Sequence, residues 1–171
     1  DALCLGVLAM QVFLDTYATD GIRPPIAREA LGSYAPAVYQ RLLQTPGIFI
    51  LVAEQQGHLV GFAQVTMGTT HTLVDHPAPA ELDRLFVQEP FTGHGLGRAL
   101  LHAAEHEAAR RGAGLLWLTP WVHNHRARHF YAREGYADVG LTWFEFEGER
   151  HENRLLTRPL ADIEAQAWRV Q

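Results

Sequence analysis

Three glycines alternate with other residues in a short turn between an apolar segment and a helical segment of the 171-residue chain. The turn reads Thr92, Gly93, His94, Gly95, Leu96, Gly97 and Arg98. Glycines let the main chain approach phosphate oxygens closely, and the unpaired N–H groups of a first helical turn attract anions. Arg98 adds a mobile positive charge. The turn therefore predicts a binding site for a pyrophosphate.

Two common nucleotide-binding patterns do not fit this turn. A Rossmann fingerprint would need a glycine at position 98, where arginine stands. A P-loop would need Gly-Lys-Ser or Gly-Lys-Thr, which the chain lacks. The remaining alternative is an ordinary strand-to-helix turn that binds nothing.

A second motif, at 124–136, reads Asn-His-Arg-Ala-Arg-His-Phe-Tyr-Ala-Arg-Glu-Gly-Tyr. Together with segment 81–112, it resembles the GNAT superfamily of N-acetyltransferases. The family signatures are Gln/Arg-x-x-Gly-x-Gly/Ala before a helix and, later, Asn-x-x-Ala-x-x-Phe-Tyr-x-x-x-Gly-Phe. Thr92 departs from the first signature, which weakens one side-chain contact to the cofactor but leaves the main-chain cradle intact.

The resemblance implies that the glycine turn holds the pyrophosphate of acetyl-coenzyme A. It also implies that two central parallel strands, 81–87 and 115–119, splay apart and admit the pantetheine arm between them. Main-chain groups of Phe86 and Val87 would bond the pantetheine. The Val87 N–H would point toward the thioester oxygen as an oxyanion site.

Acetyl transfer to an amine also needs an acid and a base. Tyr131 matches the family tyrosine that faces the cofactor sulfur, and a phenol with a pKa of about 10 is protonated at neutral pH. Packing beside Phe130 is its alternative role. Asn124 matches a cofactor-contacting asparagine and could equally cap the following helix. Glu81 stands where several family members carry a catalytic glutamate. Asp83 lies two residues later, so both side chains face the same side of the strand. For both carboxylates, the alternative is that they are simply solvated.

One pattern suggests a metal site instead, because His102, Glu105 and His106 fit the His-x-x-Glu-His arrangement of some zinc proteases. Helical spacing predicts a buried stripe of Leu96, Leu100, Ala103 and Ala104, and an exposed face of His102, Glu105, His106 and Ala109. We therefore expect no catalytic zinc. His123, His125 and His129 could also gather a metal, but we expect them to line the acceptor site or to be plain surface histidines.

Two further groups could select the acceptor. Trp121, Trp143, Phe144 and Phe146 could wall a pocket, although aromatic residues on strands more often belong to the core. Asp15, Thr16, Tyr17 and Asp20 end the first helix, where the resembled family places substrate-selecting groups. Those acids would suit a cationic amine, and solvation of the helix end is the alternative.

Hydrophobic spacing and turn residues predict the elements that position these groups. Helices are predicted over 1–17, from Pro24, from Pro36 to 43, over 96–111 and over 125–133, with a loop at 71–80. Strands are predicted over 48–54, 59–66, 81–87, 115–119, 139–147 and 154–157. This order indicates an α/β (α+β) fold. Together with the resemblance, the order of elements predicts a GNAT-like fold. Its sheet would be mixed, mostly antiparallel and twisted, with splayed central parallel strands and flanking helices.

Composition narrows the functional class. The net charge is −5 and the 14 Lys plus Arg residues are scattered, which argues against nucleic acid as a partner. The single Cys4 cannot form an internal disulfide and favours a cytoplasmic location. The apolar run at 2–10 is far shorter than the roughly 20 residues that span a bilayer, so no membrane partner is expected.

The chain is therefore predicted to be a single acetyltransferase domain over 1–171. The lack of a starting methionine leaves room for a missing strand upstream of Asp1. The predicted activity is direct transfer of the acetyl group of acetyl-coenzyme A, without a metal, to a primary amine of a small molecule. The alternatives are protein or peptide N-acetylation, a non-catalytic acyl-coenzyme A sensor and a zinc hydrolase. An edge of the last hairpin could support a homodimer.

Overall fold

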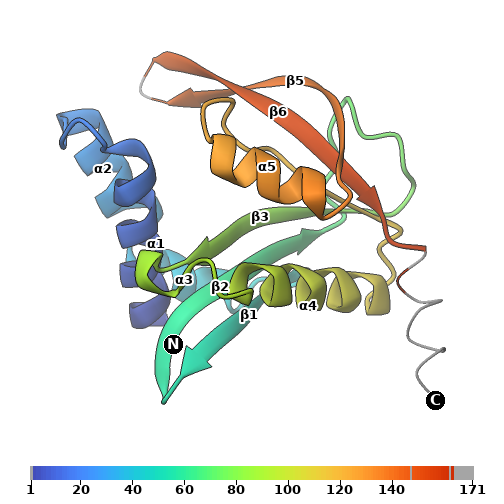
Figure 1. Cartoon of the computed structure of the whole chain (residues 1–171), viewed down its shortest axis with the longest axis horizontal. Helices are drawn as coiled ribbons and strands as arrows, with labels where there is room; N and C mark the ends of the chain where they lie inside the picture. The colour runs from blue at the N-terminus through green and yellow to red at the C-terminus, as the bar shows by residue number, and fades with distance from the viewer. Residues whose placement is uncertain (1, 147, 162, 164–171) are drawn as a thin grey trace. The chain divides into compact units, whose positions relative to one another are not determined.

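The computed structural model describes residues 2–146, 148–161 and 163 (Figure 1). The chain gathers into two compact units, of which the first comprises residues 1–64 and 84–103 and the second comprises 65–83 and 104–171. The single domain over 1–171 stays a prediction. Within the described ranges, no helix is both long enough and apolar enough to cross a membrane.

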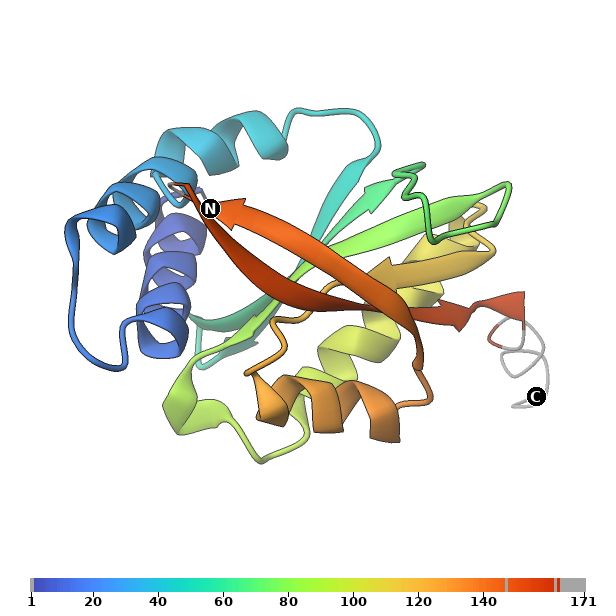
Figure 2. The ribbon, with the colours of Figure 1, turned by 90° about the horizontal axis from the view of Figure 1, so that it is seen from above.

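Three helices open the first unit: α1 (Ala2–Tyr17), α2 (Pro24–Ser33) and α3 (Pro36–Leu42). They pack on one another and form one group in both views of the ribbon (Figures 1 and 2). α2 and α3 each begin at a proline, whose missing N–H would have no helical partner at that position. α1 comes so close to the next segment that a Cβ on Gly6 would lie 2.7 Å from the Tyr34 carbonyl oxygen. All three helices match the sequence prediction.

The strands of the first unit begin with a hairpin, in which β1 (Ile48–Gln55) is followed by β2 (His58–Met67). Gln56 and Gly57 join them with φ angles of 52° and 78°, and a two-residue hairpin turn of type I′ needs positive φ at both central residues. β3 (Pro79–Val87) ends in this unit and is followed by a short 3₁₀ turn, η1 (Glu89–Phe91), and by α4 (Leu96–Arg110). The 3₁₀ turn was not predicted.

The second unit contains β4 (Leu115–Leu118), α5 (His125–Arg133), β5 (Ala137–Phe146) and β6 (Glu149–Pro159). β5 and β6 form a long twisted antiparallel hairpin (Figure 2), and β6 also pairs antiparallel with β4. In the described residues, six strands are hydrogen-bonded in the order β1-β2-β3-β4-β6-β5.

The parallel contact between β3 and β4 is short, as expected for splayed strands. It joins Pro79–Glu81 to Leu115–Trp117, whereas β3 itself continues to Val87. The predicted mixed sheet with one central parallel pair and flanking helices is therefore confirmed.

Four strands begin earlier than predicted, among them β2 at His58 rather than at 59 and β5 at Ala137 rather than at 139. β3 begins at Pro79 rather than at 81, and the Pro79 carbonyl accepts a bond from the Gly68 N–H at 2.8 Å. β6 begins at Glu149 rather than at 154, because pairing with β5 uses main-chain groups and does not need apolar side chains. The last residue of the strand predicted over 139–147 lies outside the described residues.

Candidate active site

The glycine turn lies between η1 and α4 in the first unit. Gly93 and Gly95 have φ angles of 78° and 82°, in the left-handed region that favours glycine. Thr92 closes the preceding 3₁₀ turn η1, because both its N–H (3.1 Å) and its hydroxyl (2.8 Å) donate to the Glu89 carbonyl oxygen. The Thr92 side chain is therefore used within the protein.

The main-chain amides in the middle of this turn, at residues 93–97, face solvent rather than an acceptor in the described part of the chain. Among the described residues, no hydrogen bond is donated by the N–H groups of residues 93–97. The Ala99 N–H, in the first turn of α4, donates to the Gly95 carbonyl oxygen at 3.0 Å. Residues 93–95 are exposed, so these donors are available to an anion at the positive end of the helix dipole.

Gly97 has no structural reason of its own to be glycine. Its φ is not positive, and a Cβ there would meet only the Val87 Cγ2 atom at 4.0 Å, an ordinary contact distance. Glycine in a helix costs up to about 1 kcal/mol relative to alanine. The space where a Cβ would lie is therefore open next to the turn.

Phe86 and Val87 end β3 beside this turn, and packing occupies both side chains. The Phe86 ring lies 5.5 Å from the Phe62 ring and 6.4 Å from the Tyr34 ring. The Val87 Cγ2 atom lies 3.2 Å from the position of a Cβ on Gly61. Any bond from these two residues to a cofactor must therefore come from their main-chain groups.

Asn124 caps α5 in the second unit. Its side-chain oxygen accepts a hydrogen bond from the Ala127 N–H at 3.1 Å. The side-chain amide nitrogen makes no hydrogen bond within the described part of the chain. The capping role is therefore confirmed, and the contact with a cofactor stays a prediction that the remaining donor allows.

Tyr131 lies on α5 with only 8% of its surface exposed. Its ring makes edge contacts with Phe130 at 5.1 Å and Tyr136 at 5.5 Å. Burial raises the pKa of the Tyr131 hydroxyl above its ordinary value of 10.0, so that it stays protonated at neutral pH. This hydroxyl makes no hydrogen bond to any other described residue.

Glu81 and Asp83 lie on β3 in the second unit. Glu81 is half-buried and stands opposite Trp117 in the parallel register with β4. Asp83 is exposed and accepts a hydrogen bond from the Thr66 hydroxyl at 2.7 Å. The half-buried carboxylate is the better placed of the two to be shielded from water, and its catalytic role stays a prediction.

The prediction of the exposed face of α4 is wrong for Glu105 and Ala109, whose exposed fractions are only 1% and 5%. The prediction of the buried stripe is wrong for Ala103, which is exposed. Glu105 accepts a hydrogen bond from the Tyr136 hydroxyl at 2.9 Å and pairs with Arg158 at 3.0 Å. These two partners compensate the burial of its charge. Because its carboxylate is committed to this network, Glu105 cannot serve the His-x-x-Glu-His chemistry.

The histidines of the two candidate metal patterns lie at or near the surface: His106, His123, His125 and His129 are exposed, and His102 is half-buried. In the ranges that the structure describes, no group of three or more His, Cys, Asp or Glu side chains is arranged to hold a metal ion. The His123 ring instead contacts the Trp121 ring edge-on at 5.0 Å.

The expectation that the strand aromatics belong to the core is wrong for Trp143 and Phe144, which are 45% and 51% exposed. Both lie on β5, the outermost strand in the pairing order, which has a neighbouring strand on one side only. Trp121 is half-buried, and the side chain of Phe146 lies outside the described part of the chain. An exposed apolar edge is compatible with the predicted homodimer, which stays a prediction.

The acidic end of α1 is solvated. Asp15 and Asp20 are exposed, and the Thr16 hydroxyl donates to the Val12 carbonyl oxygen at 2.8 Å. Tyr17 contacts the Phe13 ring at 5.1 Å. The predicted substrate-selecting role of these residues stays open.

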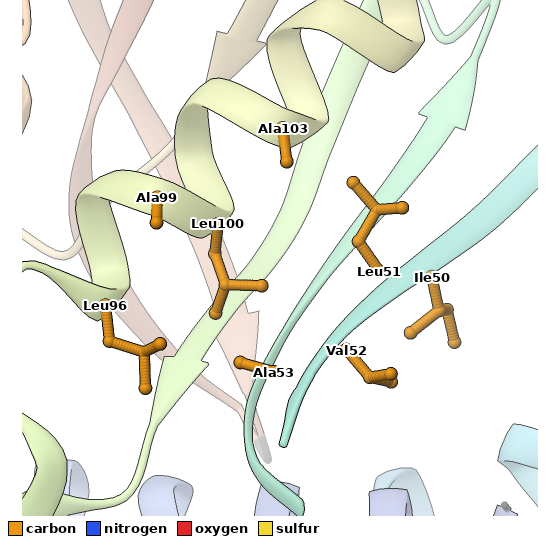
Figure 3. A pocket seen from close by; sticks show the side chains of 8 residues that line it. All are labelled: Ile50, Leu51, Val52, Ala53, Leu96, Ala99, Leu100 and Ala103. Atoms are coloured by element: carbon orange, nitrogen blue, oxygen red, sulfur yellow. The ribbon is translucent and has the colours of Figure 1, made fainter. Parts of the chain in front are cut away.

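A pocket of about 480 Å³ lies elsewhere in the first unit, between β1 and α4 (Figure 3). Residues 50–53 of β1 line it together with Leu96, Ala99, Leu100 and Ala103 of α4, and the side chains of Leu51 and Ala53 point toward the helix. Every lining side chain is aliphatic, so this pocket offers no group for acid, base or anion chemistry.

One charged residue was missed in the sequence. Arg84 lies on β3, where it donates to the Gln64 side-chain oxygen at 3.0 Å. Its guanidinium carbon lies 5.4 Å from the centre of the Tyr34 ring. The alternation of Leu82, Arg84 and Phe86 could have revealed it, because it places a charge on the apolar face of a strand.

Comparisons of the sequence and of the fold with known proteins agree with one another. The profile of the acetyltransferase (GNAT) family matches residues 15–136. An N-acetyltransferase of Lactobacillus delbrueckii subsp. lactis is 24% identical over 153 residues, covering 90% of this chain and 88% of the relative. An N-acetyltransferase of Mycobacterium tuberculosis is 31% identical over 135 residues, covering 76% and 81%. The crystal structure of the PaiA N-acetyltransferase from Thermoplasma acidophilum in complex with coenzyme A shares the fold, with a TM-score of 0.71, 20% identity and coverage of 93% and 92%.

Proposed function

The chain belongs to the GNAT family of acetyltransferases, and from this premise we propose that it acetylates a primary amine of a small molecule. The acetyl group would come from acetyl-coenzyme A, whose thioester supplies an activated acyl carbon and a thiolate leaving group. The amine would attack directly, without a covalent enzyme intermediate. The proposed location of this activity is the cytoplasm.

The observation that carries the proposal is that the amides of residues 93–97 donate to no acceptor among the residues that the structure describes. Water can satisfy such donors at an exposed helix start, so the supporting observation is their combination with a glycine at position 97 that neither its φ angle nor its neighbours require. With Arg98 following, the turn has the features of a diphosphate site: donors, a helix start and a cation. In this proposal the turn from Thr92 to Arg98 binds the cofactor, and Gly93, His94, Gly95, Leu96 and Gly97 contribute main-chain groups.

The remaining roles follow from positions in the family. Main-chain groups of Phe86 and Val87 hold the pantetheine, and the Val87 N–H stabilises the developing oxyanion. The Asn124 side-chain amide donates to the cofactor. Tyr131 donates a proton toward the leaving sulfur, for which its raised pKa keeps it protonated. Glu81 accepts the amine proton, directly or through water, since an alkyl ammonium with a pKa of about 10 is mostly protonated at pH 7.

The alternatives predict different outcomes. A peptide or protein acceptor would give activity with peptides and none with small amines. A non-catalytic acyl-coenzyme A sensor would bind the cofactor but show no turnover. A zinc hydrolase would lose its activity to a chelator, and it is disfavoured because Glu105 is already paired within the protein.

The test is to supply acetyl-coenzyme A with polyamines, aminoglycosides, amino acids and peptides and to follow thiol release. A parallel calorimetric titration measures acetyl-coenzyme A binding without an acceptor. We expect saturable binding and release of thiol with at least one amine. The absence of any heat with coenzyme A thioesters would refute the proposal.

A further inference from the structure

Arg84 lies in an aromatic cluster of the first unit, and its two described partners are neutral. It bonds Gln64, which is 2% exposed, and lies against the ring of Tyr34, which is 8% exposed. Phe86 on the same strand face completes the cluster with Phe62. A half-buried cation in such surroundings is unfavourable unless an anion compensates it.

Comparable arginines elsewhere have that anion. Arg154 pairs with Asp138 at 2.8 Å, and Arg158 pairs with Glu105 at 3.0 Å. In the described residues, Arg84 forms no ion pair within 4.0 Å. Glu29 is near enough for its charge to raise the pKa of Tyr34, which burial raises more strongly, but it does not pair with Arg84. The Tyr34 side chain is also hydrogen-bonded to Arg84. With two neutral hydrogen-bond partners among the described residues, the five N–H donors of the guanidinium are not all used, and donors remain for an anion.

A second polar group nearby also lacks a partner. Tyr39 is 0% exposed, and its hydroxyl is a buried group without any hydrogen-bond partner in the part of the chain that is described. Burial raises the pKa of Tyr39 to about 12, and the charge of Arg84 opposes this rise. Buried polar groups normally find partners, so two incomplete groups in one cluster point to a ligand.

The cluster lies next to the proposed chemistry. Arg84 and Val87 are three residues apart on β3, a separation of about 10 Å along a strand. This separation can be covered by the length of the Arg84 side chain together with that of the acceptor, if a few bonds separate the acceptor's amine from an anionic group. Building on the proposed function, we propose that Arg84 binds a carboxylate of the acceptor, which is therefore an amine that also carries a carboxylate, as amino acids do. The planar guanidinium presents two parallel donors that match the two oxygens of a carboxylate.

The experiment compares acceptors that differ only in the carboxylate: phenylalanine with 2-phenylethylamine, tyrosine with tyramine, and histidine with histamine. Thiol release gives kcat/KM for each at saturating acetyl-coenzyme A. We expect the carboxylated member of the preferred pair to be about 10- to 100-fold better, as for a charge-assisted hydrogen-bonded pair. Arg84→Gln should remove this advantage mainly through KM and leave the decarboxylated member within about twofold.

Arg41→Gln is the matched control, because Arg41 is an exposed arginine of α3 in the same unit. Arg84→Lys keeps the charge but not the paired donors and should retain an intermediate preference, even if the glutamine variant folds poorly. Equal or better kcat/KM for the decarboxylated amines, or an equal loss for both members in Arg84→Gln, would overturn this inference alone. A protein that binds no coenzyme A thioester would overturn the proposed function instead.

Discussion

Replacing Gly97 with alanine separates a ligand-binding role of the glycine turn from a structural one. The added Cβ would meet only the Val87 Cγ2 atom at 4.0 Å, so the fold accepts it without strain. Alanine in place of glycine in a helix stabilises by up to about 1 kcal/mol. For a chain of this size, that corresponds to a Tm about 2–4 °C higher. A bound diphosphate, in contrast, would lose its close contact with the main chain.

We therefore expect Gly97→Ala to be at least as stable as the parent chain and to bind acetyl-coenzyme A at least tenfold more weakly, a loss of about 1.4 kcal/mol. Thermal unfolding and calorimetric titration measure the two quantities on the same samples. Gly32→Ala is the matched control, since a Cβ at Gly32 of α2 meets nothing within 4 Å. It should gain stability without losing affinity. Unchanged cofactor affinity in Gly97→Ala, or a lower Tm, would refute the reasoning about this turn.

Three other substitutions test the rest of the site and fold. Tyr131→Phe should lower kcat about 100-fold or more through loss of general acid catalysis, with an unchanged calorimetric Kd for acetyl-coenzyme A; full activity would favour packing as its only role. Glu105→Gln should destabilise the protein by about 3 kcal/mol in denaturant unfolding, because Arg158 loses its anion. Glu107→Gln on the same helix is its control and should cost less than about 1 kcal/mol, since Glu107 pairs only with exposed arginines. Gly6→Ala should lower the unfolding free energy by about 1–3 kcal/mol, because the Cβ would clash with a main-chain oxygen 2.7 Å away; a neutral result would show that α1 can shift.

Local signals were enough to predict most elements. Prolines at 24 and 36 mark helix starts, Gly57 marks the first hairpin, and Gly93 with Gly95 marks the turn before α4. Each of these residues acts on the backbone within a few positions of itself, so its effect can be read without knowing the rest of the fold. The same holds for Asn124, whose side-chain oxygen caps α5 by accepting a hydrogen bond from the N–H of Ala127, three residues later.

Buried charges could not be predicted in this way. Glu105 has polar neighbours on α4, and its partners Tyr136 and Arg158 are 31 and 53 residues away in the sequence. Helical spacing assigns a glutamate to the exposed face, because the compensating groups become visible only in the folded chain. Arg84 is a similar case, since its partner Gln64 lies on another strand.

The Glu105 network also bears on whether Tyr131 is a packing residue or an acid. Tyr136 is fixed at its hydroxyl by Glu105, and its N–H donates to the Tyr131 carbonyl oxygen at 3.0 Å. Its ring also packs edge-on against the ring of Tyr131 at 5.5 Å. Arg158 ties the same carboxylate to the end of α5 through the Glu134 carbonyl oxygen at 2.8 Å. A phenol must be held still to donate a proton along one direction, so packing and acid catalysis are compatible roles for Tyr131, and the first makes the second possible.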